Sequence, residues 1–191
     1  MEFARFLWWM AVAALIVPFF DVVQRTFGRK AWIERATRPR VILGVLEAGT
    51  LIASLLVRGR WGFLPVRDPG VALAGAVLAL TGALFAAWAK ARLGRLFSAQ
   101  LGVQAEHQLI TTGPYAVVRH PMYLGLIDFI LGSALYWNDI ALLGAGLLFT
   151  LFFSAQLRIE EGMFARHFGE EWERYRASTP ALFPRMLRTR R

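Results

Sequence analysis

The residues most suited to bind a ligand lie around a predicted helix start at Pro121. A Gly-Pro turn signal at 113–114 precedes it. Proline fits the first position of a helix, because its missing N–H would have no partner there. The N–H groups at such a start favour an anionic group, and Arg119 and His120 add donors beside it, with Tyr123 one turn further on. This pattern predicts a site for a carboxylate-bearing ligand.

A second polar group follows the last long apolar run of the chain. Arg158 is followed by two neighbouring carboxylates, Glu160 and Glu161. Two carboxylates at the end of an apolar bundle suit a cationic or polyhydroxyl ligand. S-adenosylmethionine carries an ammonium, a sulfonium and a ribose diol, and also a carboxylate that would suit the helix start beside His120. The two groups together favour S-adenosylmethionine as the cofactor.

The elements that must position these residues are long apolar helices. Hydrophobic residues make up 57% of the chain, and a membrane span needs about 20 mostly apolar residues. We therefore expect an all-α integral membrane protein with about five transmembrane helices. The expected spans are 3–20, 41–57, 71–89, 122–137 and 140–157.

These spans predict one membrane domain over residues 1–191. Residues 1–89 hold three spans. Residues 90–191 form a cofactor-binding half, because they hold both polar groups described above, together with a transmembrane helix hairpin and a C-terminal cytoplasmic segment. Asn138 and Asp139 are the only polar break between the last two spans, which predicts a tight antiparallel hairpin.

Lys and Arg predict the orientation of these spans. The loops after the first and third spans and the C-terminal tail carry 18 basic residues, and the other side carries 4. This bias predicts an N-terminus outside and a C-terminus in the cytoplasm. The 20 Arg against 2 Lys are typical of a GC-rich genome, so we expect a bacterial inner-membrane protein.

Composition excludes several other functions. The net charge of +9 lies between and after apolar runs, so it favours anionic lipid headgroups as partners and argues against nucleic acid. The chain has no cysteine, and its three histidines are not spaced as a zinc-binding pair, so no metal site is expected. The pattern leaves the oligomeric state open.

The order of the motifs resembles one known family. Gly-Pro-Tyr-x-x-x-Arg-His-Pro-Met-Tyr-x-Gly begins at Gly113, Arg-x-Glu-Glu begins at Arg158, and Phe-Gly-Glu-Glu-Trp-Glu-Arg-Tyr begins at Phe168. Over about residues 90–184 this resembles the isoprenylcysteine carboxyl methyltransferase family and its phospholipid methyltransferase relatives. The resemblance implies a membrane-embedded, S-adenosylmethionine-dependent methyltransferase that acts on a lipophilic acceptor from the bilayer. It also implies that the C-terminal cytoplasmic segment covers the cofactor pocket.

The resemblance also implies roles for individual residues. Glu160 and Glu161 would bind the polar parts of the cofactor, although the sequence does not say which of them faces it. Tyr115 is a further candidate. The residues that would contact or shape the cofactor site are Arg119, His120, Pro121, Tyr123 and Gly125.

Catalysis by a sulfonium donor needs proximity and exclusion of water more than acid–base help. A carboxylate acceptor, as in isoprenylcysteine, would need a cation such as Arg119, Arg158 or Arg95. A lipid amine would first lose a proton, for which His120, His167 or a glutamate is suitable. Both acceptors stay open.

Two other functions compete with methyl transfer. A membrane sterol or isoprenoid reductase that uses NADPH has a similar helix hairpin, but such enzymes tend toward Asn where this chain has Met122. An inactive membrane scaffold is the second alternative. Two carboxylates within the spans, Glu47 and Asp128, are further functional candidates because charge at membrane depth is costly. The helix after Phe168 is expected to be amphipathic, with Trp172 and its apolar neighbours facing the membrane or the cofactor pocket.

Overall fold

The computed structural model describes residues 2–8, 10–13, 32–35, 68–96, 102–104 and 108–183. Residues 2–8 and 10–13 are helical. The labelled elements are β1 (Trp32–Arg35), α3 (Pro69–Leu93), a 3₁₀ turn (Gly94–Leu96), β2 (Gly102–Gln104), α4 (Pro114–Val117), α5 (Pro121–Trp137), α6 (Ile140–Phe168) and α7 (Glu170–Ser178).

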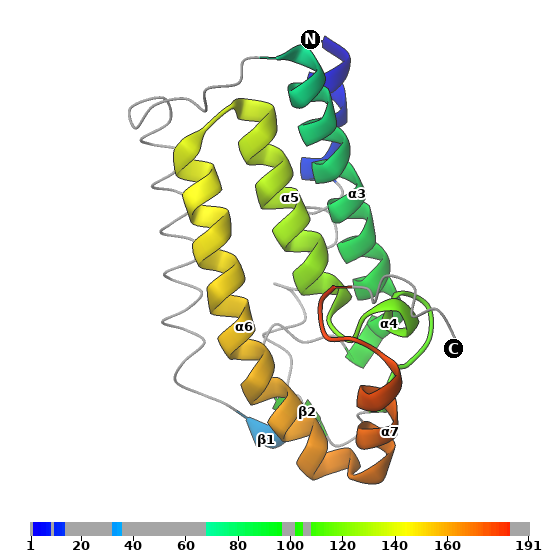
Figure 1. Cartoon of the computed structure of the whole chain (residues 1–191). Coiled ribbons are helices and arrows are strands. Elements are labelled where there is room, and N and C mark those ends of the chain that lie inside the picture. Colours follow the sequence, from blue (N-terminus) through cyan, green and yellow to red (C-terminus); the bar gives the residue numbers. More distant parts are fainter. Residues whose placement is uncertain are drawn as a thin grey trace, which may run out of the picture.

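The three long helices α3, α5 and α6 run side by side (Figure 1). α4 and α7 lie at one end of this bundle, where α3 ends, α5 begins and the polar part of α6 is found. This arrangement confirms that the residues just before α5 and those after 157 share one end of the molecule. Arg119, His120, Glu160 and Glu161 are therefore gathered there.

The hairpin between α5 and α6 is confirmed, and local residues explain it. Asn138 adopts the left-handed conformation with φ 54°, and its N–H donates to the carbonyls of Ala134 and Leu135. Asp139 then caps α6, because its side chain accepts from the N–H groups of Ala141 and Leu142. One residue thus ends a helix and the next starts another, which turns the chain back on itself.

Small residues let α3 and α5 approach closely. A Cβ added at Gly82 would lie 2.7 Å from Asp128 Cβ, and one added at Gly132 would lie 2.6 Å from the Gly75 carbonyl oxygen. Ala79 and Ala83 of α3 are fully buried in the same region. Such small-residue contacts replace the hydrophobic driving force that is missing between helices in lipid.

The N-terminal helical segment packs on the opposite end of this pair. Trp8 Nε1 donates to Ser133 Oγ at 3.0 Å, and the Trp8 ring stacks on Tyr136 at 5.8 Å and meets Trp137 edge-on at 5.2 Å. Ala11 joins the buried cluster on α3. The described part of the first expected span therefore belongs to the bundle.

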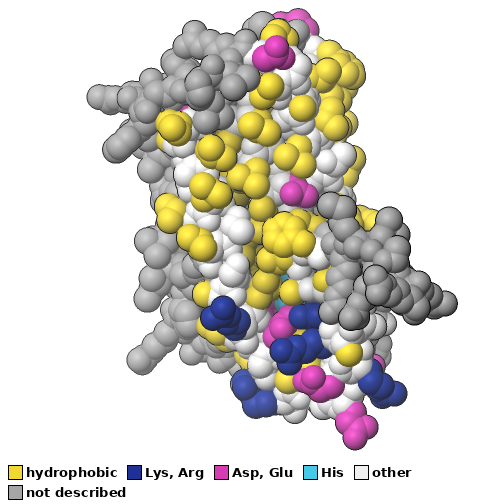
Figure 2. Space-filling view, in the orientation of Figure 1, with side chains coloured by type: hydrophobic (Ala, Val, Ile, Leu, Met, Phe, Trp, Pro, Cys, Tyr) yellow, Lys and Arg dark blue, Asp and Glu magenta, His cyan; other side chains and the backbone are white. Residues whose placement is uncertain are grey.

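Two described helices, α3 and α6, are long and apolar enough to cross a membrane, and α5 is apolar but shorter. On the face of the molecule shown in Figure 2, hydrophobic side chains cover most of the length of the bundle, and charged side chains gather mainly toward the end that carries α7. The apolar part of α6 ends near residue 157, and its last turns carry charge. The expected span at 41–57 lies outside the described residues.

One detail of the all-α prediction is wrong. β1 and β2 pair antiparallel, with Trp32 opposite Gln104 and Arg35 opposite Gly102. Both strands lie in segments that the sequence analysis treated as connections, and each has at most four residues. So short a pair forms through contacts distant in the chain, which local sequence patterns do not report.

We expect Gly132→Ala to lower the melting temperature of the detergent-solubilised protein, because the added methyl overlaps the backbone of α3; overpacking of this kind costs about 1–3 kcal/mol. Gly144→Ala on α6 is the matched control, since a Cβ there meets nothing within 4 Å. That control should keep or raise the melting temperature, because alanine favours a helix. Equal melting temperatures for the two variants would contradict the packing described here.

Candidate functional site

His120 lies where α5 begins, and its imidazole ring is buried. The residue is 6% exposed and stands immediately before Pro121, the first residue of α5. Its Nε2 lies 3.2 Å from Glu161 Oε1, and its Nδ1 lies 3.7 Å from Glu160 Oε2. The ring is therefore held between the two carboxylates that the sequence analysis paired with it.

Glu161 binds Arg119 as well as His120. Arg119 donates to Glu161 Oε1 from Nε at 3.0 Å and from Nη2 at 2.6 Å. Burial acts to raise the pKa of Glu161, but the hydrogen bonds and positive charges of His120 and Arg119 outweigh it and lower that pKa to about 2. Glu161 lies beyond the apolar part of α6 and is ionised at neutral pH.

Arg119 also holds the segment that follows α7. Its Nη1 donates to the carbonyls of Thr179 and Arg176, the latter at 3.1 Å. The backbone N–H groups of Arg119 and His120 donate to the carbonyls of Pro180 at 2.8 Å and of Ala181 at 3.0 Å. The C-terminal segment 170–181 is thereby fastened to the start of α5.

Aromatic side chains of α6 and α7 make further contacts that hold the C-terminal segment in place. The guanidinium carbon of Arg119 lies 5.7 Å from the centre of the Trp172 ring, and Trp172 packs on Phe164 of α6 at 5.3 Å. Tyr175 donates from its hydroxyl to the Tyr115 carbonyl at 2.6 Å. Burial raises the pKa of both the Tyr115 and the Tyr175 phenols, so both stay neutral.

Glu160 is placed differently from Glu161. Its Oε2 is buried and has no hydrogen-bond partner among the described residues. Beside it, the Tyr123 ring stacks against His120 at 5.8 Å and against Phe153 of α6 at 4.5 Å. An ionised oxygen without a hydrogen-bond partner is costly unless a ligand satisfies it, so Glu160 is the carboxylate open to a ligand.

Several predicted residues lie away from this cluster. Arg158 is exposed, and so is His167. Gly125 faces α3, where an added Cβ would lie 2.8 Å from Ala86 Cβ. Asp128 lies at the same interface, beside Gly82. The candidate Glu47 and the side chain of Arg95 fall outside the described residues.

The sequence analysis did not predict that the end of α7 contacts Arg119. Trp172 is 1% exposed and Tyr175 is buried, so these two side chains face inward from α7 and not toward lipid. Trp172 and Tyr175 are three positions apart in a helix that is otherwise mainly charged, and this spacing could have indicated that they share a buried face. The carbonyls of Arg176 and Thr179 carried no signal, because backbone groups look alike in every sequence.

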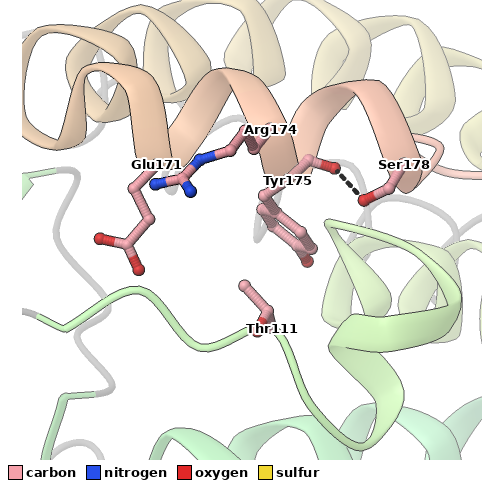
Figure 3. Close-up of a pocket in the computed structure, with 5 residues that line it drawn as sticks. All are labelled: Thr111, Glu171, Arg174, Tyr175 and Ser178. Atoms are coloured by element: carbon pink, nitrogen blue, oxygen red, sulfur yellow. Dashed lines mark hydrogen bonds between the residues drawn. The ribbon is translucent and has the colours of Figure 1, made fainter.

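A separate hollow lies on another face of α7. It has a volume of about 410 Å³ and is lined by Thr111, Glu171, Arg174, Tyr175 and Ser178. Figure 3 shows α7 on one side and the segment with Thr111 on the other, with Ser178 Oγ donating to the Tyr175 carbonyl at 3.0 Å. All but Tyr175 are exposed, and Glu160 and Glu161 are not among the lining residues. We therefore place the candidate site at His120 and not in this hollow.

Comparison with known proteins assigns the chain to a family. The phospholipid methyltransferase family model matches residues 71–171, which include most of α3 and all of α5 and α6. The chain belongs to this family. Its fold is similar to that of a eukaryotic intramembrane Ras methyltransferase, an isoprenylcysteine carboxyl methyltransferase, with a TM-score of 0.57 and 20% identity over 80% of this chain and 55% of that one.

Curated relatives carry two kinds of name. A protein-S-isoprenylcysteine O-methyltransferase of Schizosaccharomyces pombe is 38% identical over 41% of this chain and 34% of its own length. The nickel-cobalt-cadmium resistance protein NccN of Alcaligenes xylosoxydans xylosoxydans is 31% identical over 78% of this chain and 67% of its own length. The match thus spans about a third of the yeast protein and two thirds of the second.

We expect Arg119→Lys to loosen segment 170–181, because lysine keeps the charge but cannot form the same set of hydrogen bonds. Amide hydrogen exchange of residues 172–181 should become at least about tenfold faster, since hydrogen bonds to a charged group contribute about 1.5–3 kcal/mol. Arg158→Lys is the control, because Arg158 is exposed. Unchanged exchange in Arg119→Lys would show that other contacts hold the segment.

The lowered pKa of Glu161 predicts a pH dependence. Its value of about 2 in the folded chain is below the ordinary value of about 4.3. The contribution of Glu161 to stability is therefore complete above about pH 4.5 and is lost as the pH falls toward 2. The melting-temperature difference between wild type and Glu161→Gln should shrink over that range, whereas exposed Glu171→Gln should melt like wild type. A constant difference from pH 6 to pH 3 would contradict this assignment.

Proposed function

We propose that the chain is a membrane methyltransferase that uses S-adenosylmethionine and acts on a lipophilic acceptor. One observation carries the proposal. In a chain of the phospholipid methyltransferase family, Glu160 keeps a buried carboxylate oxygen that accepts no hydrogen bond from the described residues, beside the ordered cluster of Arg119, His120 and Glu161. A positively charged ligand would satisfy that oxygen.

The residues present fit the positive parts of this cofactor. Glu160 offers an anion to its ammonium and sulfonium groups, and the rings of Tyr123 and Phe153 form an aromatic wall nearby. Arg119 already makes four hydrogen bonds of the five its guanidinium can donate. It is therefore better suited to position Glu161 and segment 170–181 than to hold a carboxylate on its own.

S-adenosylmethionine, when bound, supplies a methyl group on a positively charged sulfur that leaves as a neutral thioether. The chain's own residues contribute orientation and exclusion of water. Glu161 and Arg119 fix the position of His120, His120 lies against Glu160, and segment 170–181 covers the end of α5 and α6. His120 thus acts as a positioning residue for the carboxylate that would bind the cofactor.

The proposed location follows from the charge pattern. With the N-terminus outside and the C-terminus in the cytoplasm, the His120 end of the bundle faces the cytoplasm, where S-adenosylmethionine is made. The basic residues near that end would bind anionic headgroups. A bacterial inner membrane is the proposed setting. The lipophilic acceptor would reach the site from the bilayer, between the helices.

The names of the relatives leave two acceptors open, an isoprenylcysteine carboxylate and a phospholipid amine. A reductase that uses NADPH and an inactive scaffold remain the competing functions. Calorimetric titration of the detergent-purified protein with S-adenosylhomocysteine and, separately, with NADPH distinguishes them. Binding of NADPH alone would favour the reductase, and binding of neither would favour the scaffold.

We expect Glu160→Gln to weaken S-adenosylhomocysteine binding by at least about tenfold, because a hydrogen bond to a charged group is worth about 1.5–3 kcal/mol. The melting temperature should stay close to that of wild type, since Glu160 Oε2 accepts no hydrogen bond from the described residues and its contact with His120 is 3.7 Å long. The double variant Glu160→Gln/Glu161→Gln should abolish binding. Glu171→Gln is the control, and undiminished affinity in Glu160→Gln would refute the role proposed for Glu160.

A further inference from the structure

Gln156 of α6 is a buried polar residue outside the cluster of Arg119, His120, Glu160 and Glu161. It is 5% exposed, and its Oε1 has no hydrogen-bond partner within the part of the chain that the structure describes. An unpaired buried amide oxygen costs about 1–3 kcal/mol. A ligand that donates a hydrogen bond to this oxygen would remove that cost.

The contacts on either side of Gln156 locate it. Phe153, one turn earlier on α6, packs on Tyr123 of α5 at 4.5 Å between ring centres. Glu160, one turn later, lies 3.7 Å from His120 of α5. Residues 153, 156 and 160 share one face of a helix, so Gln156 lies on the α5-facing side of α6, between these two contacts.

Gln156 also lies nearer the bilayer than Glu160 does. Four residues of helix separate them, a rise of about 6 Å, and Gln156 is within the apolar part of α6. A water-soluble cofactor that binds Glu160 would come from the polar end of the bundle. A lipophilic acceptor would come from the apolar side and reach Gln156 before it reaches Glu160.

We propose that Gln156 binds the head group of the methyl acceptor, and that this acceptor reacts through an amine or hydroxyl group that donates a hydrogen bond. The proposal rests on the methyltransferase function proposed above. Gln156 Oε1 accepts the hydrogen bond of the acceptor, which places the reacting nitrogen or oxygen beside the cofactor at Glu160. The two oxygens that lack hydrogen-bond partners here, Gln156 Oε1 and Glu160 Oε2, favour such a donor group.

The surrounding charges argue against a carboxylate acceptor. A carboxylate beside Gln156 would bring its oxygens toward Gln156 Oε1 and Glu160 Oε2, two oxygens that accept no hydrogen bond from the described residues and would donate none to it. Among the described residues, Arg119 gives its donors to Glu161 and to the carbonyls after α7, and Arg158 is exposed. Neither of these two arginines is available at Gln156 to hold a second anion.

Methyl transfer to such an acceptor accounts for every bond, electron pair and proton. The lone pair of its nitrogen or oxygen forms the bond to the methyl carbon, and the carbon–sulfur bond breaks with its electron pair staying on sulfur. The acceptor loses one proton, which passes to water. The acceptor becomes a methylated amine or ether.

The test compares two Gln156 variants of the full-length protein in lipid nanodiscs. Gln156→Met keeps the size of the side chain but removes its polar atoms, and Gln156→Glu keeps an acceptor oxygen. Leu157→Met, also buried, is the matched control. Each protein is titrated with S-adenosylhomocysteine and assayed for transfer of a labelled methyl group to phosphatidylethanolamine, to a prenylated phenol and to an S-prenylcysteine carboxylate.

We expect Gln156→Met to raise the KM for the amine or phenol acceptor by about tenfold, the effect of one lost hydrogen bond of about 1.4 kcal/mol. Its affinity for S-adenosylhomocysteine should change by less than about twofold. Gln156→Glu should restore the KM to within a few-fold of wild type, and Leu157→Met should match wild type throughout.

Three results would overturn the inference while leaving the methyltransferase function intact. The first is an unchanged KM in Gln156→Met. The second is that the wild-type protein methylates the S-prenylcysteine carboxylate but neither phosphatidylethanolamine nor the prenylated phenol. The third is loss of S-adenosylhomocysteine binding in both Gln156 variants, which would place Gln156 at the cofactor. Failure of the wild-type protein to bind S-adenosylhomocysteine would instead refute the proposed function itself.

Discussion

The carboxylate of Glu161 joins three segments that lie far apart in the sequence. It accepts hydrogen bonds from Arg119 at 3.0 and 2.6 Å and lies 3.2 Å from His120, both before α5. Through Arg119 the same cluster reaches the carbonyls of Arg176 and Thr179 after α7. Because these groups are buried or half-buried, removing one partner would leave the others with unmet charge. The start of α5, the end of α6 and the C-terminal segment are therefore held in one arrangement.

This arrangement gives two neighbouring carboxylates different environments. Successive residues on a helix point about 100° apart, so Glu161 accepts hydrogen bonds from Arg119, while the Oε2 of Glu160 lies 3.7 Å from His120 and accepts no hydrogen bond from the described residues. Glu161 is fixed and ionised, and Glu160 is free to meet a ligand. His120, between them, links the structural carboxylate to the available one. One short motif thus supplies both the support and the binding group of the candidate site.

The close contact of α3 and α5 sets where that site can form. Glycines on both helices bring the backbones together, so α5 is fixed on one side by α3 and on the other by its short turn into α6. Only the polar ends of α5 and α6 then remain for binding a water-soluble cofactor, while their apolar length stays beside lipid. Gln156 lies between these two zones, where a cofactor and a lipophilic acceptor would meet. Membership of the phospholipid methyltransferase family agrees with such a division.

Local signals in the sequence determined the three long described helices, their order and the residues of the motif. Apolar length indicated α3, α5 and α6, Pro121 marked the start of α5, and Asn138 with Asp139 marked the hairpin, because each of these effects acts within a few residues. The tertiary structure decided which glutamate is available, that Gly125 packs on α3, and that Arg119 holds the end of α7. It also decided that Gln156 is buried beside the site. These outcomes depend on helix rotation and on contacts between residues 40 to 60 positions apart, which hydrophobic periodicity and motif spacing do not encode.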